Sequence, residues 1–238
     1  MTTASIDASQ RKAARVVGLS YLLVIPPALF AGIYVAGQLV VHKNAADMAQ
    51  WIMSHERLFR LGIACDLTAF TIDIALIAAL YVVLRPVSRG LALFAAFCRV
   101  IETALFFSVT LKYFDVLGLL SGADHLQGLD ANHLQSLARL AISAHNSGYN
   151  VGLVLAGVGS TVFCYLWFKS RYIPKALAGF GVFASVILAT FTFAYVIFPE
   201  YAKVITVSYY GGPIFLFELA MGFWLLIKGI QEPGSRPS

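Results

Sequence analysis

Charged side chains are scarce in this chain of 238 residues: Asp, Glu, Lys and Arg make up 12% of it, and hydrophobic residues 59%. A typical soluble domain carries about 25% charged residues. A soluble fold of this length would need more charged surface than these residues supply, which argues against a soluble enzyme. The net charge of +5 lies in short connectors, unlike the clustered Lys and Arg of a nucleic-acid-binding face. The composition therefore predicts an integral membrane protein that binds no nucleic acid.

Metal-binding and nucleophile motifs are missing. Cys65, Cys98 and Cys164 lie in separate apolar runs, which argues against a disulfide framework or a cysteine-ligated metal. The chain has no phosphate-binding glycine loop, no HExxH and no GxSxG. The spacing of its histidines matches no zinc motif; they are His42, His55, His125, His133 and His145. We therefore expect neither a metal nor a cofactor.

Long apolar runs dominate the chain. A spanning helix needs about 20 mainly apolar residues, and six runs meet this length: residues 16–41, 58–84, 90–120, 148–168, 176–198 and 204–227. The predicted fold class is all-α, a polytopic bundle of six transmembrane helices over residues 16–230. Residues 1–15 and 231–238 are the expected tails.

The basic residues indicate an orientation. Ten Lys and Arg residues lie on the side of the N-terminus and five on the other side, with Arg99 and Lys112 inside the third run. Because cytoplasmic loops carry the excess of Lys and Arg, both termini are expected in the cytoplasm. Residues 44–57 and 130–144 have amphipathic patterns and predict two short helices on the outer side, which either rest on the interface or cover a cavity.

Prolines and small residues mark points within the runs. Pro26-Pro27 predicts a kink in the first helix, and Gly211-Gly212-Pro213 predicts either a break or a loosening at the start of the sixth. Small residues recur every four positions in the fourth run, at Gly148, Gly152, Ala156 and Ser160. This spacing allows close helix packing, within the chain or at the seam of a homodimer.

Four ionisable residues lie far from the ends of their runs: Asp73, Arg99, Glu102 and Glu218. Counted from the cytoplasmic anchors, they lie about 15–20 Å deep at the helical rise, near the centre of a hydrocarbon layer about 30 Å thick. Such residues face the bundle interior, where they form a functional site or a packing latch. Arg99 and Glu102 share a helix face at i, i+3 and are expected to pair.

The midplane charges do not balance. If all three carboxylates were ionised against one Arg99, they would sum to −2. We therefore expect Asp73 or Glu218, with Glu218 the first choice, to be protonated at neutral pH or to share a cation. A second set of polar residues, the second-tier residues, lies nearer the outer surface of the membrane than the four midplane residues. They are Asp66 and Asn150, with Lys112, Asp115, Arg57 and Arg60. They either rim an outward cavity or are simply solvated at the interface.

Several short motifs resemble a known family: Arg11-Lys12, Arg99 with Glu102, the turn Ser170-Arg171-Tyr172-Ile173-Pro174-Lys175, and the ending Phe217–Trp224 followed by Lys228-Gly229. In combination they resemble the bacterial membrane proteins of the domain-of-unknown-function 4386 family, over roughly residues 11–230. The resemblance implies a six-helix inner-membrane protein and no established activity.

Three functions remain open at this point. The first is binding, transport or sensing of a small or lipid-like ligand in a polar midplane cavity of Asp73, Arg99, Glu102 and Glu218, rimmed by Asp66 and Asn150. The second is an intramembrane enzyme acting on an apolar or lipid substrate, with Glu102 or Glu218 as general acid. The third is an accessory subunit that packs against another membrane protein.

Overall fold

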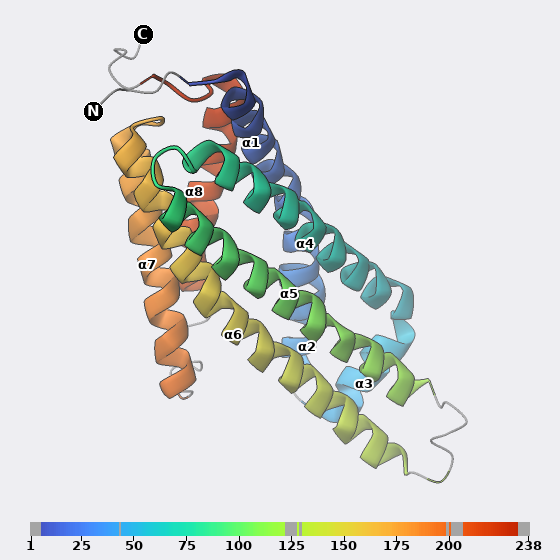
Figure 1. The fold of residues 1–238 in the computed structure, drawn as a ribbon. Helices are drawn as coiled ribbons and strands as arrows, with labels where there is room; N and C mark the ends of the chain where they lie inside the picture. Colours follow the sequence, from blue (N-terminus) through green and yellow to red (C-terminus); the bar gives the residue numbers. More distant parts are fainter. Residues whose placement is uncertain are drawn as a thin grey trace. The chain divides into compact units, whose positions relative to one another are not determined.

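The computed structural model describes residues 6–42, 44–121, 128, 130–198, 200 and 207–232. In these residues it has helices and no strand (Figure 1): α1 (Ala8–Leu29), the π-helical segment η1 (Phe30–Val35), α2 (Ala36–Val41), α3 (Ala45–Ser54), α4 (Glu56–Leu84), α5 (Arg89–Leu120), α6 (Ala131–Ser170), α7 (Lys175–Ile197) and α8 (Val207–Ile227). Six stretches are long and apolar enough to cross a membrane: Ala8–Val41, Glu56–Leu84, Arg89–Leu120, Ala131–Ser170, Lys175–Ile197 and Tyr209–Ile227. The all-α fold with six transmembrane helices is confirmed. His125 and the outer parts of both tails lie outside the described residues.

The contacts divide the chain into two compact units. Unit 1 comprises Met1–Leu23, Ile72–Thr103 and Asn150–Ser238, and unit 2 comprises Val24–Thr71 and Ala104–Tyr149. All four midplane residues, Asp73, Arg99, Glu102 and Glu218, fall in unit 1.

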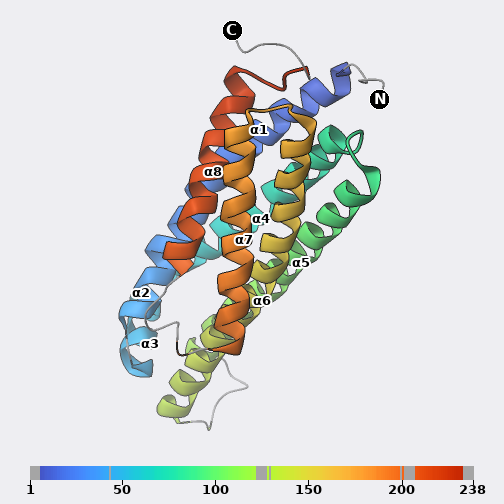
Figure 2. The same cartoon turned by 90° about the vertical axis from the view of Figure 1, so that its left-hand side faces the viewer.

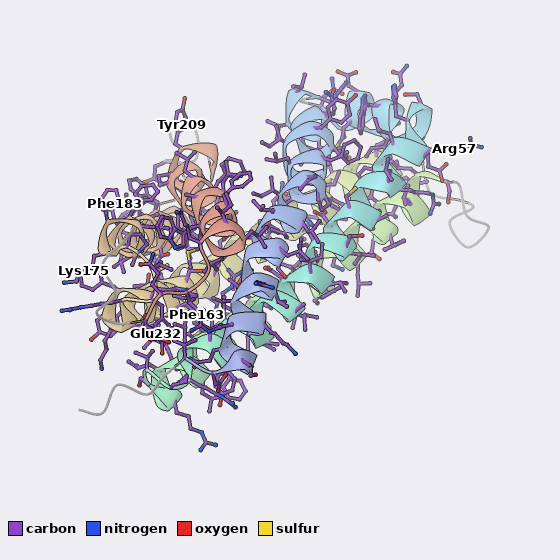
Figure 3. All side chains as sticks on the ribbon, turned by 90° about the horizontal axis from the view of Figure 1, so that it is seen from above. Arg57, Phe163, Lys175, Phe183, Tyr209 and Glu232 are labelled. Carbon is purple, nitrogen blue, oxygen red and sulfur yellow. The ribbon has the colours of Figure 1, made fainter. Side chains whose placement is uncertain are left out.

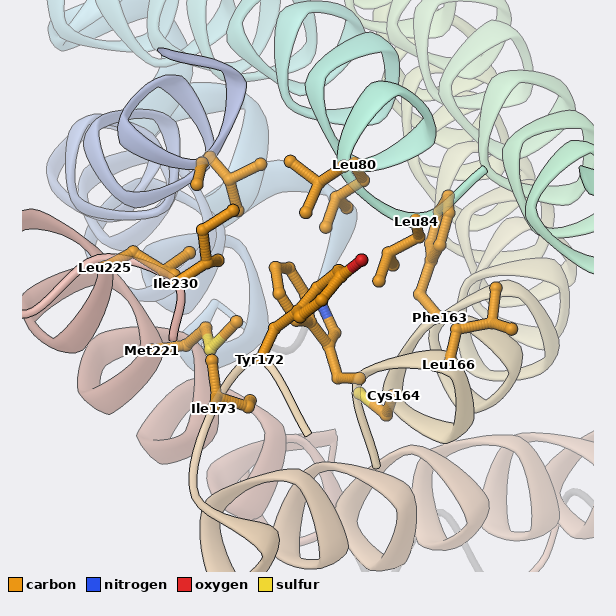
Figure 4. Close-up of a cluster of buried hydrophobic side chains, with 14 of the residues drawn as sticks. Leu80, Leu84, Phe163, Cys164, Leu166, Tyr172, Ile173, Met221, Leu225 and Ile230 are labelled. Carbon is orange, nitrogen blue, oxygen red and sulfur yellow. The ribbon is translucent and has the colours of Figure 1, made fainter. Parts of the chain in front are cut away.

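An apolar cluster gathers around the turn between α6 and α7 in unit 1. Figure 4 shows Tyr172 at its centre, among Leu80 and Leu84 of α4 and Met221 of α8. The Gln10 side chain donates to the Val83 carbonyl at 3.1 Å and to the Tyr172 hydroxyl at 3.4 Å. These buried hydrogen bonds hold the start of α1 against α4 and against the turn between α6 and α7. The start of α1 is therefore fixed by polar as well as apolar contacts.

Helices α7 and α8 run side by side in unit 1 (Figure 2). Helix α6 contacts α7 closely at a glycine. A Cβ on Gly157 of α6 would lie 2.7 Å from both Cα and Cβ of Ala189. Large apolar residues cover the outer faces, and in Figure 3 Phe183 of α7 and Tyr209 of α8 point away from the other helices of unit 1. Such faces suit contact with lipid rather than water.

Unit 2 has its own core around α3. Asn44 begins this helix by accepting a hydrogen bond from the Asp47 N–H at 2.7 Å, which satisfies one of the free donors of the first turn. Met48 and Ile52 of α3 are buried against Phe59 and Ile63 of α4 and Val116 of α5. A short helix therefore does form within residues 44–57.

The second expected outer helix does not form as a separate element. Residues 131–144 are the first turns of α6, which continues without a break to Ser170. The polar stretch His145-Asn146-Ser147 looks like a boundary in the hydropathy pattern. None of these residues is a helix breaker, however, because each keeps its backbone N–H and tolerates helical dihedral angles.

The proline expectations have mixed outcomes. The chain stays helical through Pro26 and Pro27, and the irregularity follows them as η1, where the Ala36 N–H bonds to the Ala31 carbonyl in the i→i+5 pattern. The break at Gly211-Gly212-Pro213 was a wrong prediction, because α8 runs through Pro213. In the second turn of a helix that proline removes one intrahelical bond, which membrane helices tolerate.

Two of the four small residues of α6 pack against other helices of the chain. Gly148 faces the Val109 side chain of α5 within unit 2, at a distance that leaves no room for a Cβ. Ala156 is buried against Leu188 of α7 and Tyr210 of α8 in unit 1. Gly148 and Ala156 therefore make close contacts with other helices inside their own units.

Candidate functional site

Arg99 lies between two carboxylates in unit 1. Its Nη1 donates to Glu102 Oε1 at 3.2 Å and lies 3.0 Å from Glu102 Oε2. Its Nη2 donates to both oxygens of Asp73, at 3.3 and 3.2 Å. The side chains of Arg99, Asp73 and Glu102 are 10%, 13% and 3% exposed. The expected Arg99–Glu102 contact is present, and Asp73 is a second partner that helical spacing could not predict.

The surrounding backbone makes room for this guanidinium. A Cβ at Gly159 of α6 would lie 2.9 Å from Cγ of Arg99 and 3.1 Å from the Ala95 carbonyl oxygen. Only glycine leaves the stem of Arg99 its space at this position. Thr103 satisfies its own hydroxyl by donating to the Arg99 carbonyl at 2.9 Å, so it adds no unpaired polar group to the site.

Glu218 reaches the same region of unit 1 from α8. It is half-buried and within electrostatic range of Arg99 and Asp73, and no hydrogen bond or ion pair links it to another described residue. Together with Arg99, Tyr21, Ser160 and Cys164 it lines a cavity. The cavity has a volume of about 10 Å³, which is close to what one water molecule requires.

The site holds more negative than positive groups. Asp73, Glu102 and Glu218 face one guanidinium, and two of the three acids already contact it. Glu102 Oε2 also lacks a well-oriented hydrogen bond even though it lies 3.0 Å from Nη1. Two ionised acids against Arg99 give a net charge of −1, and an ionised Glu218 would raise the excess to −2. Burying such an excess is costly unless a proton or a cation neutralises it.

The second-tier residues are not gathered at this cavity. Asp66 belongs to unit 2 and Asn150 to unit 1, and neither is among the residues that line it. Lys112 pairs with Asp115 at 2.9 Å and Arg60 with Glu56 at 2.7 Å, all four being about half exposed. These are ordinary surface pairs, and Arg57 is exposed as well.

Three cavity residues with polar side-chain atoms were missed by the sequence reasoning: Tyr21, Ser160 and Cys164. From the sequence, Ser160 was considered only for helix packing and Cys164 only as a disulfide or metal candidate. Their i, i+4 spacing on α6 puts both polar atoms on one face, which is the signal that could have found them. Within the described residues, no group of three or more His, Cys, Asp or Glu is placed to hold a metal.

Comparison with known proteins places the chain in a family. The family model described as a domain of unknown function, DUF4386, matches residues 16–229. The chain belongs to the DUF4386 family. It is 26% identical over 173 residues to an uncharacterized protein of Archaeoglobus fulgidus, an alignment that covers 70% of this chain and 83% of the relative. No solved structure matches.

This DUF4386 member therefore takes no activity from its relatives, since neither the family nor the archaeal relative has a described function. The archaeal relative also shows that similar chains are not confined to bacteria, to which the sequence resemblance alone had pointed. The site combines a fixed cation, two acids paired with it, and a third acid beside a water-sized space.

Proposed function

We propose that this membrane protein reversibly binds a proton at Glu218, with Arg99, Asp73 and Glu102 as the fixed charges of the site. The observation that carries the proposal is the position of Glu218. It lines the cavity beside Arg99 and, unlike Asp73 and Glu102, has no ion pair among the described residues. A carboxyl that is half-buried and unpaired in a site already rich in acids favours the neutral, protonated form.

The size of the cavity favours a proton over larger ligands. A space for about one water molecule has no room for a lipid-like ligand, nor for an apolar substrate next to Glu102 or Glu218 as general acid. A hard metal cation would need about six oxygen ligands, and the Arg99 guanidinium would repel it. A proton needs only the carboxyl and a neighbouring water.

The Arg99 contacts support a different role for the other two acids. Asp73 on α4 and Glu102 on α5 are both held by the one guanidinium, so they contribute fixed negative charge and link the two helices within unit 1. This is the packing latch considered from the sequence, here adjoining the acid that binds the proton.

Infrared difference spectroscopy between acidic and alkaline pH tests the proposal. The purified protein is expected to show the C=O band of a protonated carboxylic acid, displaced in D2O, and Glu218→Gln is expected to remove it. Glu56→Gln is the matched control, because Glu56 is an exposed glutamate paired with Arg60 and its loss should leave the band in place. A band that persists in Glu218→Gln, or its absence from the unmodified protein, contradicts the proposal.

The same site would serve transport or sensing, and proteoliposomes separate the two. Proton uptake that follows an imposed pH gradient and disappears in Glu218→Gln supports transport. Protonation without uptake supports sensing.

For the location, we propose a cytoplasmic membrane with both termini in the cytoplasm, supported by the ten-to-five excess of Lys and Arg on the side of the N-terminus.

A further inference from the structure

The turn between α6 and α7 adjoins the segment that follows α8, at one end of unit 1 (Figure 1). The Gln231 N–H donates to the Tyr172 carbonyl at 2.9 Å, so the backbone joins the two segments. Together they carry four exposed cations, which we call the basic cluster: Lys169, Arg171, Lys175 and Lys228. Both segments contain motifs that the sequence singles out, and the Glu218 cavity uses neither of them.

The turn holds its cations on an ordered backbone. The Ser170 hydroxyl donates to the Trp167 carbonyl at 2.9 Å and accepts from the Tyr172 N–H at 3.2 Å. Between Ser170 and Tyr172, Arg171 has a φ of 57°, in the left-handed region where glycine is the usual residue after a helix. An arginine at this position carries backbone strain that a glycine would avoid. Its exposed side chain therefore needs a reason other than the folding of the turn.

The charges of the basic cluster are not neutralised by acids of unit 1. Among the residues that the structure describes, none of the four cations forms an ion pair. Glu232 is the acid nearest to Lys228 in the sequence, and it pairs with Arg11 of α1 at 3.1 Å. Lys175 has its Nζ 6.0 Å from the centroid of the Phe168 ring, a contact that leaves its charge in place. In Figure 3 Lys175 points away from the helices of unit 1.

The basic cluster lies at the level of the lipid headgroups. Lys169 is in the last turn of α6, Lys175 is the first residue of α7, and Lys228 directly follows α8. All three helices are long and apolar enough to span a membrane. Large apolar side chains directly precede two of these lysines, namely Phe168, which is 41% exposed, and Ile227, which is 74% exposed. Cations next to exposed apolar side chains suit a ligand with an anionic head and apolar chains.

We propose that the basic cluster binds the headgroup of an anionic phospholipid, whose acyl chains lie along the exposed apolar faces of α7 and α8. The lipid phosphate binds at Arg171, because a guanidinium can donate two parallel hydrogen bonds to a phosphate group. The lysines add positive charge around it. The site uses no residue of the Glu218 cavity, so it stands or falls independently of the function proposed above.

Native mass spectrometry of the full-length protein in detergent tests the proposal. The protein is titrated with phosphatidylglycerol and, separately, with phosphatidylcholine of the same acyl chains. We expect phosphatidylglycerol to bind more tightly. Arg171→Gln should weaken its binding about fivefold, the contribution of one basic residue near an anionic surface. Equal affinities for the two lipids in the unmodified protein overturn the proposal.

Two triple variants separate a site from general attraction by net charge. The first, with Lys169→Gln, Arg171→Gln and Lys175→Gln, should lose most of the preference for phosphatidylglycerol. The matched control removes three exposed cations of unit 2, through Arg57→Gln, Lys112→Gln and Arg139→Gln, and should keep the preference. An equal loss in both triple variants, or an unchanged preference in the first, contradicts binding at the basic cluster.

Arg171→Gly separates lipid binding from a structural role of the turn. Glycine relieves the left-handed backbone, so this variant should raise the midpoint of thermal unfolding in detergent without added lipid. The same variant should weaken the binding of phosphatidylglycerol. A lower midpoint would show that the arginine stabilises the turn, and unchanged lipid binding would show that it does not hold the phosphate. Either result contradicts the assigned role of Arg171.

Inorganic phosphate distinguishes a lipid from a free anion. An excess of inorganic phosphate should leave most of the phosphatidylglycerol bound, because phosphate has no acyl chains to contact the apolar faces. Complete displacement would show that the basic cluster takes a soluble anion, which contradicts the assignment to a lipid.

Discussion

Arg99 and Asp73 are 26 positions apart in the chain, yet Nη2 of the arginine donates to both oxygens of the aspartate, at 3.3 and 3.2 Å. The same guanidinium holds Glu102 one turn further along α5. One cation thus links α4 to α5 in the apolar interior of unit 1. Its removal should leave two buried acids without a partner.

Arg99→Leu should therefore lower the free energy of unfolding by more than the loss of the arginine's own contacts, because it also leaves buried acids unpaired. It leaves Asp73 and Glu102 without their partner, and breaking a buried pair from one side costs about 3–5 kcal/mol. Adding Asp73→Asn and Glu102→Gln to Arg99→Leu should recover much of that loss, because no ionised acid then remains unpaired. Thermal unfolding in detergent measures both changes. Lys112→Leu, which breaks an exposed pair with Asp115, should cost at most about 1 kcal/mol. Simple additivity of the three substitutions would mean that the residues do not act as one group.

Gly157→Ala should weaken the contact between α6 and α7. The new Cβ would lie 2.6 Å from the Ala189 backbone nitrogen, which cannot move aside as a side-chain end could. Overpacking of this kind costs about 1–3 kcal/mol. Gly118→Ala in α5 has open space around its Cβ and should be neutral or stabilising by up to about 1 kcal/mol, because alanine favours the helix. The unfolding midpoint of Gly157→Ala should fall, while that of Gly118→Ala should stay the same or rise. Equal shifts in the two variants would contradict the close contact at Gly157.

Filling the cavity at Glu218 should slow the exchange of its proton. Ser160 lines the cavity, and Ser160→Leu would occupy the space for the water molecule. The carboxylic acid band expected for Glu218 should then move more slowly after transfer to D2O than in the unmodified protein. Ser143→Leu, an exposed substitution on the same helix, is the control for general effects on α6. Equal exchange rates in all three proteins would show that this cavity does not supply water to Glu218.

Labelling from outside the cell tests the proposed topology. Cysteines placed at Ala46 and Ser136 should react with a membrane-impermeant maleimide in intact cells, and one at Ser88 should react only after the membrane is opened. Ala46 and Ser136 are both exposed. The three native cysteines are replaced by alanine first. Labelling of Ser88→Cys alone in intact cells would reverse the orientation.

Hydropathy predicted the six spans because each apolar run exceeds the thickness of the hydrocarbon. Helical spacing likewise predicted the contact of Arg99 with Glu102, since i and i+3 share a face. The Asp73 contact could not be predicted, because depth along a helix says nothing about its rotation toward a neighbour. The size of the cavity also depends on side-chain packing among α1, α4, α5, α6 and α8, which no single-helix pattern contains.

Local sequence was misleading where the preference of a single residue opposed the hydrogen bonding of a long helix. Pro213 read as a break, but one lost backbone bond does not outweigh the hydrogen bonds of the following turns. Residues 145–147 read as the outer edge of a span, yet α6 passes through them. In both cases the cooperativity of the helix outweighed individual residue preferences.

The uninterrupted α6 has a consequence for hydrogen exchange. Its 40 residues extend about 60 Å, twice the hydrocarbon thickness of about 30 Å, and a tilt of about 20° shortens the excess only slightly. One continuous ladder of amide hydrogen bonds must therefore pass from lipid into the aqueous phase. The amides of its polar first turns, at Asn132 and Ser136, should exchange with deuterium far sooner than those around Ala156, although no loop or break separates them.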